Sequence, residues 1–186
     1  MRLGAKARRR GAASVEFALV GIPTIFILIS VFEISRGMWM YETVAHAVRE
    51  GARYAAVHGQ DCAVAPNTCG KTMAQIAQQV QNSGVGLDAA QFTVTVSINL
   101  GATPTSLAVD GPQTLASMLN DTTNFSAWTF VTNGSNVNAS TPGNDVVVSG
   151  EMPFRSALAM FWPGAKGTQG FATTKLVATS QERILF

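Results

Sequence analysis

The chain has 186 residues, of which 47% are hydrophobic and only 13% are charged, a low charged fraction for a soluble domain. Its net charge of +2 comes from the N-terminus, because residues 1–11 hold five of the 13 cations and no anion, leaving a net charge of −3 on the remainder. The remainder therefore offers no basic surface for nucleic acid, and its length allows one small domain beside an apolar segment.

The N-terminus joins a basic leader, residues 1–11, to an apolar segment, Ala12–Phe32, whose only charge is Glu16. At 1.5 Å per residue this segment is roughly 31 Å long as a helix, close to the thickness of a bilayer's hydrocarbon core. We therefore predict one membrane-spanning helix over residues 12–33. Because the cations lie on its N-terminal side, the N-terminus is expected in the cytoplasm and the rest of the chain outside it.

The position of a glycine separates this segment from a secretory signal peptide. The apolar run ends in Phe32-Glu33-Ile34-Ser35-Arg36, which lacks the small-residue cleavage site of such a peptide. A glycine precedes the run instead: Gly11 is followed by Glu16 at the fifth position after it. Together with Glu16-Phe17 and the later Gly51-Ala52-Arg53, this pattern resembles the TadE-like pseudopilins of the Tad (Flp) type IV pilus system. The resemblance is close over about Gly11–Tyr54 and looser beyond.

The resemblance implies a minor pilin of the inner membrane with a periplasmic domain, needed for pilus assembly and so for adhesion or secretion. A prepilin peptidase is expected to cut between Gly11 and Ala12, and Glu16 and Phe17 are expected to act in assembly. The implied partners are the peptidase, other Tad minor pilins, the major Flp pilin, the inner-membrane assembly platform and membrane lipid. The alternative is an uncleaved bitopic anchor whose outer domain binds another envelope component.

A helical pattern continues beyond Glu33. Apolar residues recur at alternating steps of four and three, which predicts a seam on one continuous helix over residues 12–58 that faces a partner or the chain's own domain. The seam comprises Ile34, Met38, Tyr41, Ala45, Val48, Ala52 and Ala55. Glu50 and Arg53 have the spacing of an ion pair, and Trp39 indicates interfacial anchoring or packing against the domain.

Two cysteines follow this helix. Cys62 and Cys69 flank a Pro66-Asn67 turn signal, and outside the cytoplasm such a pair favours a short disulfide-closed loop. A metal site with His58 as a third ligand is the rival, although the spacing fits no common zinc pattern. No cofactor is expected. His46 and His58, about 18 Å apart on one helix, cannot share a ligand, and no arrangement of catalytic residues indicates an enzyme.

Residues 60–186 predict a small α+β domain. Thr72-Met73-Ala74-Gln75 has the pattern of a capping box, which begins a short helix that ends at Gly84. Phe92–Leu100 alternates apolar and polar residues as a strand does, and Val146–Met152 and Phe171–Thr179 are less regular strands. Three strands suffice for a sheet that covers the helix seam. The expected class is therefore α+β: a single-pass N-terminal membrane helix extends into a long amphipathic helix packed on a small antiparallel sheet, as in pilins.

The remaining segments carry weaker signals. Residues 120–145 are rich in Ser, Thr, Asn, Asp, Gly and Pro, which predicts an exposed loop. Trp128, Phe130 and Val131 interrupt this polarity and either hold the loop to the domain or form a short edge strand. Ser156–Trp162 is an apolar segment expected to pack on the sheet. The predicted divisions are thus a leader (1–11), a membrane helix (12–33), its extramembrane continuation (34–59) and a periplasmic domain (60–186).

Overall fold

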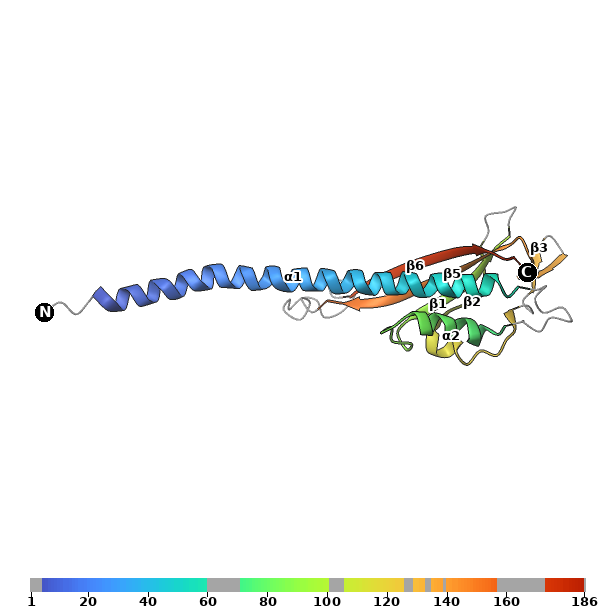
Figure 1. The fold of residues 1–186 in the computed structure, drawn as a ribbon, viewed down its shortest axis with the longest axis horizontal. Coiled ribbons are helices and arrows are strands. Elements are labelled where there is room, and N and C mark those ends of the chain that lie inside the picture. Colours follow the sequence, from blue (N-terminus) through green and yellow to red (C-terminus); the bar gives the residue numbers. More distant parts are fainter. Residues whose placement is uncertain are drawn as a thin grey trace. The chain divides into compact units, whose positions relative to one another are not determined.

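The computed structural model describes residues 5–59, 71–100, 106–125, 129–132, 135–138, 140–156 and 173–185. The chain divides into two compact units. The first comprises Met1–Met38 and Arg155–Ala172, and the second comprises Trp39–Phe154 and Thr173–Phe186. Figure 1 shows the elements of both units. The predicted class is confirmed, because a long N-terminal apolar helix is combined with a small antiparallel sheet.

Helix α1 extends from Ala5 to Ala56 without interruption, although Pro23 lies inside it. The sequence predicted a continuous helix to about residue 58, so its C-terminal end is correct to within two residues. The Arg53 guanidinium lies 3.5 Å from the Glu50 carboxylate, which confirms the predicted ion pair. The backbone of the basic leader from Ala5 onward belongs to the same helix.

The second unit contains a four-stranded sheet with the order β2-β1-β5-β6. Its strands are β1 (Thr93–Asn99), β2 (Ser106–Thr114), β5 (Asp145–Arg155, whose last residue belongs to the first unit) and β6 (Thr173–Arg183). Strand β1 is antiparallel to both of its neighbours. Its residues alternate between half-buried and buried as predicted, and Val96 and Ile98 are fully buried opposite Val148 and Val146 of β5.

The C-terminal part of α1 packs on this sheet and on helix α2 (Met73–Ser83). Two glycines permit the close approach. A Cβ atom at Gly150 of β5 would lie 2.6 Å from the Val48 Cγ1 atom of α1. A Cβ at Gly51 of α1 would lie 2.4 Å from the Val80 Cγ2 atom of α2. Real Cβ atoms do not come this close, so any larger residue at either position would force its neighbour to shift. The capping box at Thr72 and Gln75 is present, and Gly84 caps the other end of α2, as predicted.

The predicted helix seam is only partly correct. Ile34, Met38 and Tyr41 are 63%, 65% and 46% exposed. The face of α1 that is buried in the second unit consists of Val44, Ala47, Val48, Gly51, Ala52, Ala55 and Ala56. The reason is geometric, because a repeat of four and three residues drifts by about 20° per heptad around a straight helix of 3.6 residues per turn. The seam and the buried face therefore coincide over Val48, Ala52 and Ala55, with Ala45 half-buried against the same core.

Two further elements differ from the predictions. Residues 120–145 are not a loop throughout, since β3 (Thr129–Thr132) and β4 (Ser135–Asn138) form an antiparallel hairpin. The alternative of a short strand at Phe130 and Val131 is therefore the correct one. Strand β2 and the short helix α3 (Leu115–Met118) were not predicted. Residues 157–162 of the predicted apolar segment lie outside the described residues.

Candidate functional site

The residues that the sequence singled out for assembly lie near the N-terminal end of α1. Gly11 and Ala12 belong to the helix backbone. Glu16 and Phe17 follow about one turn later, and both are exposed, Phe17 to 79%. Among the residues whose side chains are described, no ion pair involves Glu16. The carboxylate and the phenyl ring are therefore presented on the outside of the helix.

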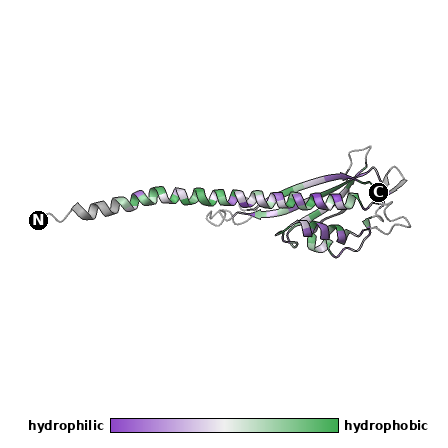
Figure 2. Ribbon diagram, viewed as in Figure 1, coloured by the Kyte–Doolittle hydropathy of each residue, from purple (hydrophilic) through white to green (hydrophobic). Residues whose placement is uncertain are grey.

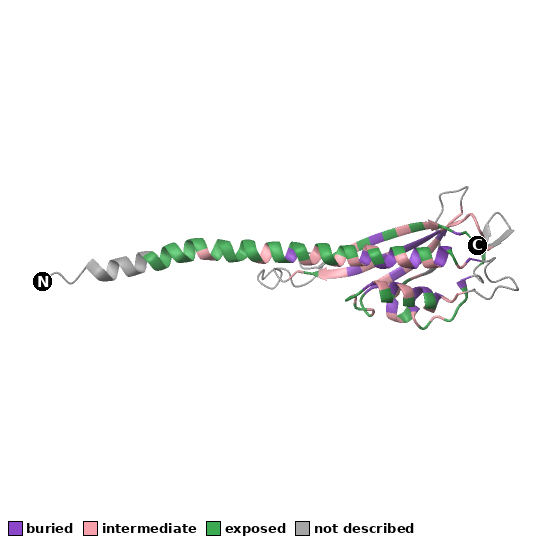
Figure 3. Cartoon of the chain, in the orientation of Figure 1, coloured by how far each residue is buried: buried purple, intermediate pink, exposed green. Residues whose placement is uncertain are grey.

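The following stretch of α1, Ala13–Phe32, presents apolar side chains around its whole circumference. Eleven large apolar residues are each 48–79% exposed, from Val15 to Phe32. Figure 2 shows this part of the helix as hydrophobic, and Figure 3 shows it as exposed. Leaving one such side chain in water rather than burying it costs about 1.5–3 kcal/mol, so the whole segment would cost on the order of 15 kcal/mol or more. That matches or exceeds the whole stability of a typical domain, so an apolar medium or partner must cover the segment.

The polar side chains inside this apolar segment are satisfied by the helix itself. The Thr24 hydroxyl donates to the Val20 carbonyl at 2.7 Å, and the Ser30 hydroxyl donates to the Phe26 carbonyl at 2.8 Å. Neither hydroxyl therefore needs water as an acceptor, which is the condition for placing it in lipid. Within the described residues, α1 from Ala13 onward is the one helix long and apolar enough to cross a membrane.

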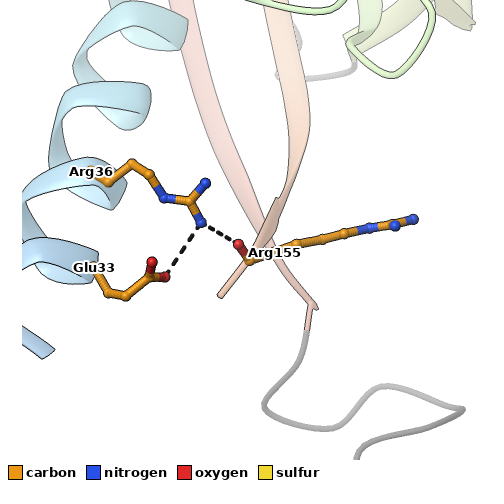
Figure 4. A network of polar contacts seen from close by, with 3 residues as sticks. All are labelled: Glu33, Arg36 and Arg155. Carbon is orange, nitrogen blue, oxygen red and sulfur yellow. Dashed lines mark hydrogen bonds and ion pairs between the residues drawn. The ribbon is translucent and has the colours of Figure 1, made fainter. Parts of the chain in front are cut away.

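A polar network follows the apolar segment, within the first unit. Glu33 is only 7% exposed, although it lies on a helix whose neighbouring residues are open. The Arg36 guanidinium lies 3.3 Å from the Glu33 carboxylate and also donates to the backbone carbonyl of Arg155 at the end of β5. Figure 4 shows the Arg155 side chain pointing away from both. The spacing of three between Glu33 and Arg36 was visible in the sequence, but their burial and the carbonyl of Arg155 were not.

Neither of the two histidines is part of this network, and Cys62 and Cys69 lie outside the described residues. The pairing of the cysteines therefore stays a prediction. His46 is exposed, and the His58 ring is 2.7 Å from the Tyr54 carbonyl and packs on the Tyr54 ring. In the part of the chain that the structure describes, no three His, Cys, Asp or Glu residues are grouped as metal ligands would be.

These features define the class: a protein with one N-terminal candidate membrane helix and a small α+β domain. Residues 11–53 match the family model of TadE-like proteins, so this stretch of α1 is a TadE-like segment and the resemblance carried by Gly11, Glu16 and Phe17 is confirmed. The match covers 43 of the 186 residues, so it identifies this segment and does not extend to the domain that follows it. Comparison with curated proteins and with solved structures gave no significant match.

Proposed function

We propose that the chain is a minor pilin, or pseudopilin, of a Tad (Flp) pilus that a prepilin peptidase cuts between Gly11 and Ala12. The observation that carries the proposal is the exposed apolar stretch of α1, which lies within the TadE-like segment and has Glu16 as its only charge. In this role the mature protein is held in the inner membrane by residues 12–33, with the leader in the cytoplasm and the domain in the periplasm. It serves pilus assembly, and so adhesion or secretion, as a structural component and not as an enzyme.

Glu16 acts in subunit assembly through the amine that cleavage creates. A carboxylate at the bilayer centre would cost on the order of 3 kcal/mol, and less near the interface, so a cationic partner is favoured. Cleavage after Gly11 gives Ala12 a free α-amino group about 6 Å along the helix axis from Glu16. In a bundle of staggered helices, the amine of a neighbouring subunit reaches the same carboxylate. The open position of Glu16 and Phe17 leaves room for such a neighbour.

The partners of this role are the prepilin peptidase, the other Tad minor pilins, the major Flp pilin and the inner-membrane assembly platform. The periplasmic location supports a disulfide between Cys62 and Cys69, because that compartment is oxidising. The alternative is an uncleaved bitopic anchor, which would retain the leader in its mature form.

The deciding experiment is an intact-mass measurement on protein from cells that contain the matching peptidase. We expect wild-type protein to lack residues 1–11 and the Gly11→Leu variant to retain them, because the peptidase requires a small residue at the cut. Gly4→Leu is the matched control, since it makes the same substitution inside the leader, and it should be cut normally. Wild-type protein that keeps its leader and still supports pilus assembly would establish the uncleaved anchor instead.

The role of Glu16 is tested separately by complementation of a deletion strain. Glu16→Ala should be cleaved, inserted and folded, yet should fail to restore pili or to crosslink to pilin partners. Glu42→Ala removes an exposed carboxylate from a later turn of the same helix and should restore pili. Normal pili in the Glu16→Ala strain would remove the proposed role of this carboxylate.

A further inference from the structure

The turns of α1 after the apolar stretch continue to present large apolar side chains outward, while their charged side chains pair with each other. Ile34, Met38 and Trp39 are 63%, 65% and 56% exposed. The charged residues of these turns, Glu33 and Arg36, are respectively buried and half-buried, and they are paired with each other. To its surroundings, this part of the helix therefore remains apolar well beyond Phe32.

A second element of the second unit adds an apolar residue beside Trp39. The turn between α2 and β1 contains Gly86, whose φ is +85° and whose added Cβ would lie only 3.1 Å from the Trp39 Cη2 atom. One edge of the indole ring therefore rests on the backbone of this turn. The residue before Gly86 is Val85, which is 71% exposed, the highest value among the large apolar residues described in the second unit. We call Trp39 and Val85 together the collar.

We propose that the collar contacts the boundary between headgroups and acyl chains of the phospholipid bilayer, on the side of the membrane where the domain lies. The proposal rests on the membrane span of the proposed function, and it moves the end of that span from Glu33 to Met38. Tryptophan is the residue that such boundaries favour, because its ring is apolar and its N–H is polar. A helix and a turn that both present exposed apolar residues at one level fit a lipid surface.

The charges around the collar select the kind of lipid. Glu42 on α1 and Asp88 after the turn are both exposed, and Asp88 accepts hydrogen bonds from the Ala90 amide and the Gln91 side chain. The nearest cation along the helix, Arg36, is engaged by Glu33 and by the Arg155 carbonyl. Arg155 at the end of β5 is also exposed, so Glu42, Asp88 and Arg155 together leave no cationic excess that would attract anionic headgroups. The collar therefore fits a zwitterionic lipid such as phosphatidylethanolamine or phosphatidylcholine.

Moving the end of the membrane span from Glu33 to Met38 also moves its beginning. A span of about 20 residues that ends at Met38 begins near Leu19, so Glu16 lies about one turn outside the hydrocarbon core. Glu33 and Arg36 then lie within the outer part of the membrane, where an unpaired charge is costly. Their mutual pairing and the carbonyl of Arg155 lower that cost.

The test measures the depth of single tryptophans in full-length protein reconstituted into phosphatidylcholine vesicles. Trp128 and Trp162 are replaced by phenylalanine, and emission from Trp39 is compared in lipids that carry bromine near the headgroup or near the chain end. We expect a greater loss of Trp39 emission with the shallow bromine. In a Trp39→Phe background, Val85→Trp should show the same preference. Ile27→Trp, from the middle of the span, should be quenched more by the deep bromine.

Leu185→Trp in the Trp39→Phe background is the matched control for Val85→Trp. Leu185 is 63% exposed, and its amide bonds to the carbonyl of Ala56, about 26 Å along α1 from Trp39. It should show no quenching by either lipid.

The outcomes separate the collar from the span on which it rests. If Ile27→Trp is quenched but Trp39 and Val85→Trp are not, the span exists and the collar is wrong. A blue-shifted Trp39 emission without lipid quenching would likewise overturn it and assign this surface to a protein partner. If Ile27→Trp is also not quenched by either brominated lipid, both the collar and the membrane span of the proposed function fail. If the quenching is as expected but cells that lack the chain still form pili, only the proposed function fails.

Discussion

The contact between α1 and α2 at Gly51 gives the sharpest stability prediction. In Gly51→Ala the new Cβ would lie 2.4 Å from the Val80 Cγ2 atom, so the Val80 side chain or one of the two helices must shift. Overpacking of this kind costs about 1–3 kcal/mol. Alanine is better than glycine in a helix by about 1 kcal/mol, which offsets part of that cost. We therefore expect Gly51→Ala to lower the free energy of unfolding by about 1 kcal/mol, although the helix propensity alone predicts the opposite sign.

The assay is urea unfolding of the full-length protein in detergent, followed by circular dichroism. Val80→Ala removes the methyl groups that the new Cβ would meet and leaves a cavity, so it is destabilising by itself. In the double variant the added methyl fills part of that cavity, and we expect a favourable coupling of about 1 kcal/mol or more between the two sites. A Gly51→Ala variant as stable as wild type, or a pair that is simply additive, would refute the close contact on which this reasoning depends.

Three further predictions concern other parts of the chain. Arg36→Ala leaves Glu33 buried without its cation and should lower the free energy of unfolding by about 1–3 kcal/mol in the same assay. The double variant Glu33→Gln with Arg36→Met removes both charges and should be closer to neutral, so equal losses in the two variants would contradict the pairing. Alkylation of exported, non-reduced protein should find no free thiol at Cys62 or Cys69, and ready labelling of both would disprove the disulfide. Thr72→Ala removes the N-cap of α2 and should cost about 1 kcal/mol, with Thr72→Ser as the control that retains the cap.

The elements that could be predicted from the sequence are those specified by local chemistry. The capping box at Thr72 needs only residues three apart, and it is present as predicted. The alternation in β1 follows from one face of the strand being buried, and it also matches. The apolar stretch of α1 is equally local, since its length and composition alone make it a candidate membrane helix. For the same reason the TadE-like segment could be recognised from its residues alone.

The unpredicted strand β2 contains the residues that usually argue against a strand. Gly111 and Pro112 lie inside it, and the ladder to β1 shifts register between Val94 and Val96. Gly111 has a φ of +99°, and its added Cβ would lie 2.6 Å from the Val94 carbonyl oxygen. Proline is tolerated because β2 is at the edge of the sheet and Pro112 lies where the register to β1 is irregular. Edge position and register are properties of the assembled sheet, so the sequence pattern could not supply them.

The hairpin β3–β4 is a different case, because its sequence contains a local turn signal within a polar segment. The strands are antiparallel with Thr132 opposite Ser135, which leaves two residues between them, Asn133 and Gly134 in the sequence. Asn-Gly is the pair most typical of a two-residue hairpin turn. The polar composition of residues 120–145 concealed it, since polarity alone does not separate a loop from an exposed hairpin.

The burial pattern of α1 explains how one helix can serve both a domain and a membrane. Its C-terminal turns face their own domain with small residues, and Ala47, Gly51 and Ala55 are buried there. Its earlier turns keep the large apolar side chains, such as Phe17 and Met38, outside. Small residues allow the close approach that a fixed protein contact needs, whereas large flexible groups suit lipid or an exchangeable neighbour. Both parts contain apolar residues, but the small ones form the surface buried in the domain, whereas the large ones form the exposed surface that the proposed function assigns to the membrane and to assembly.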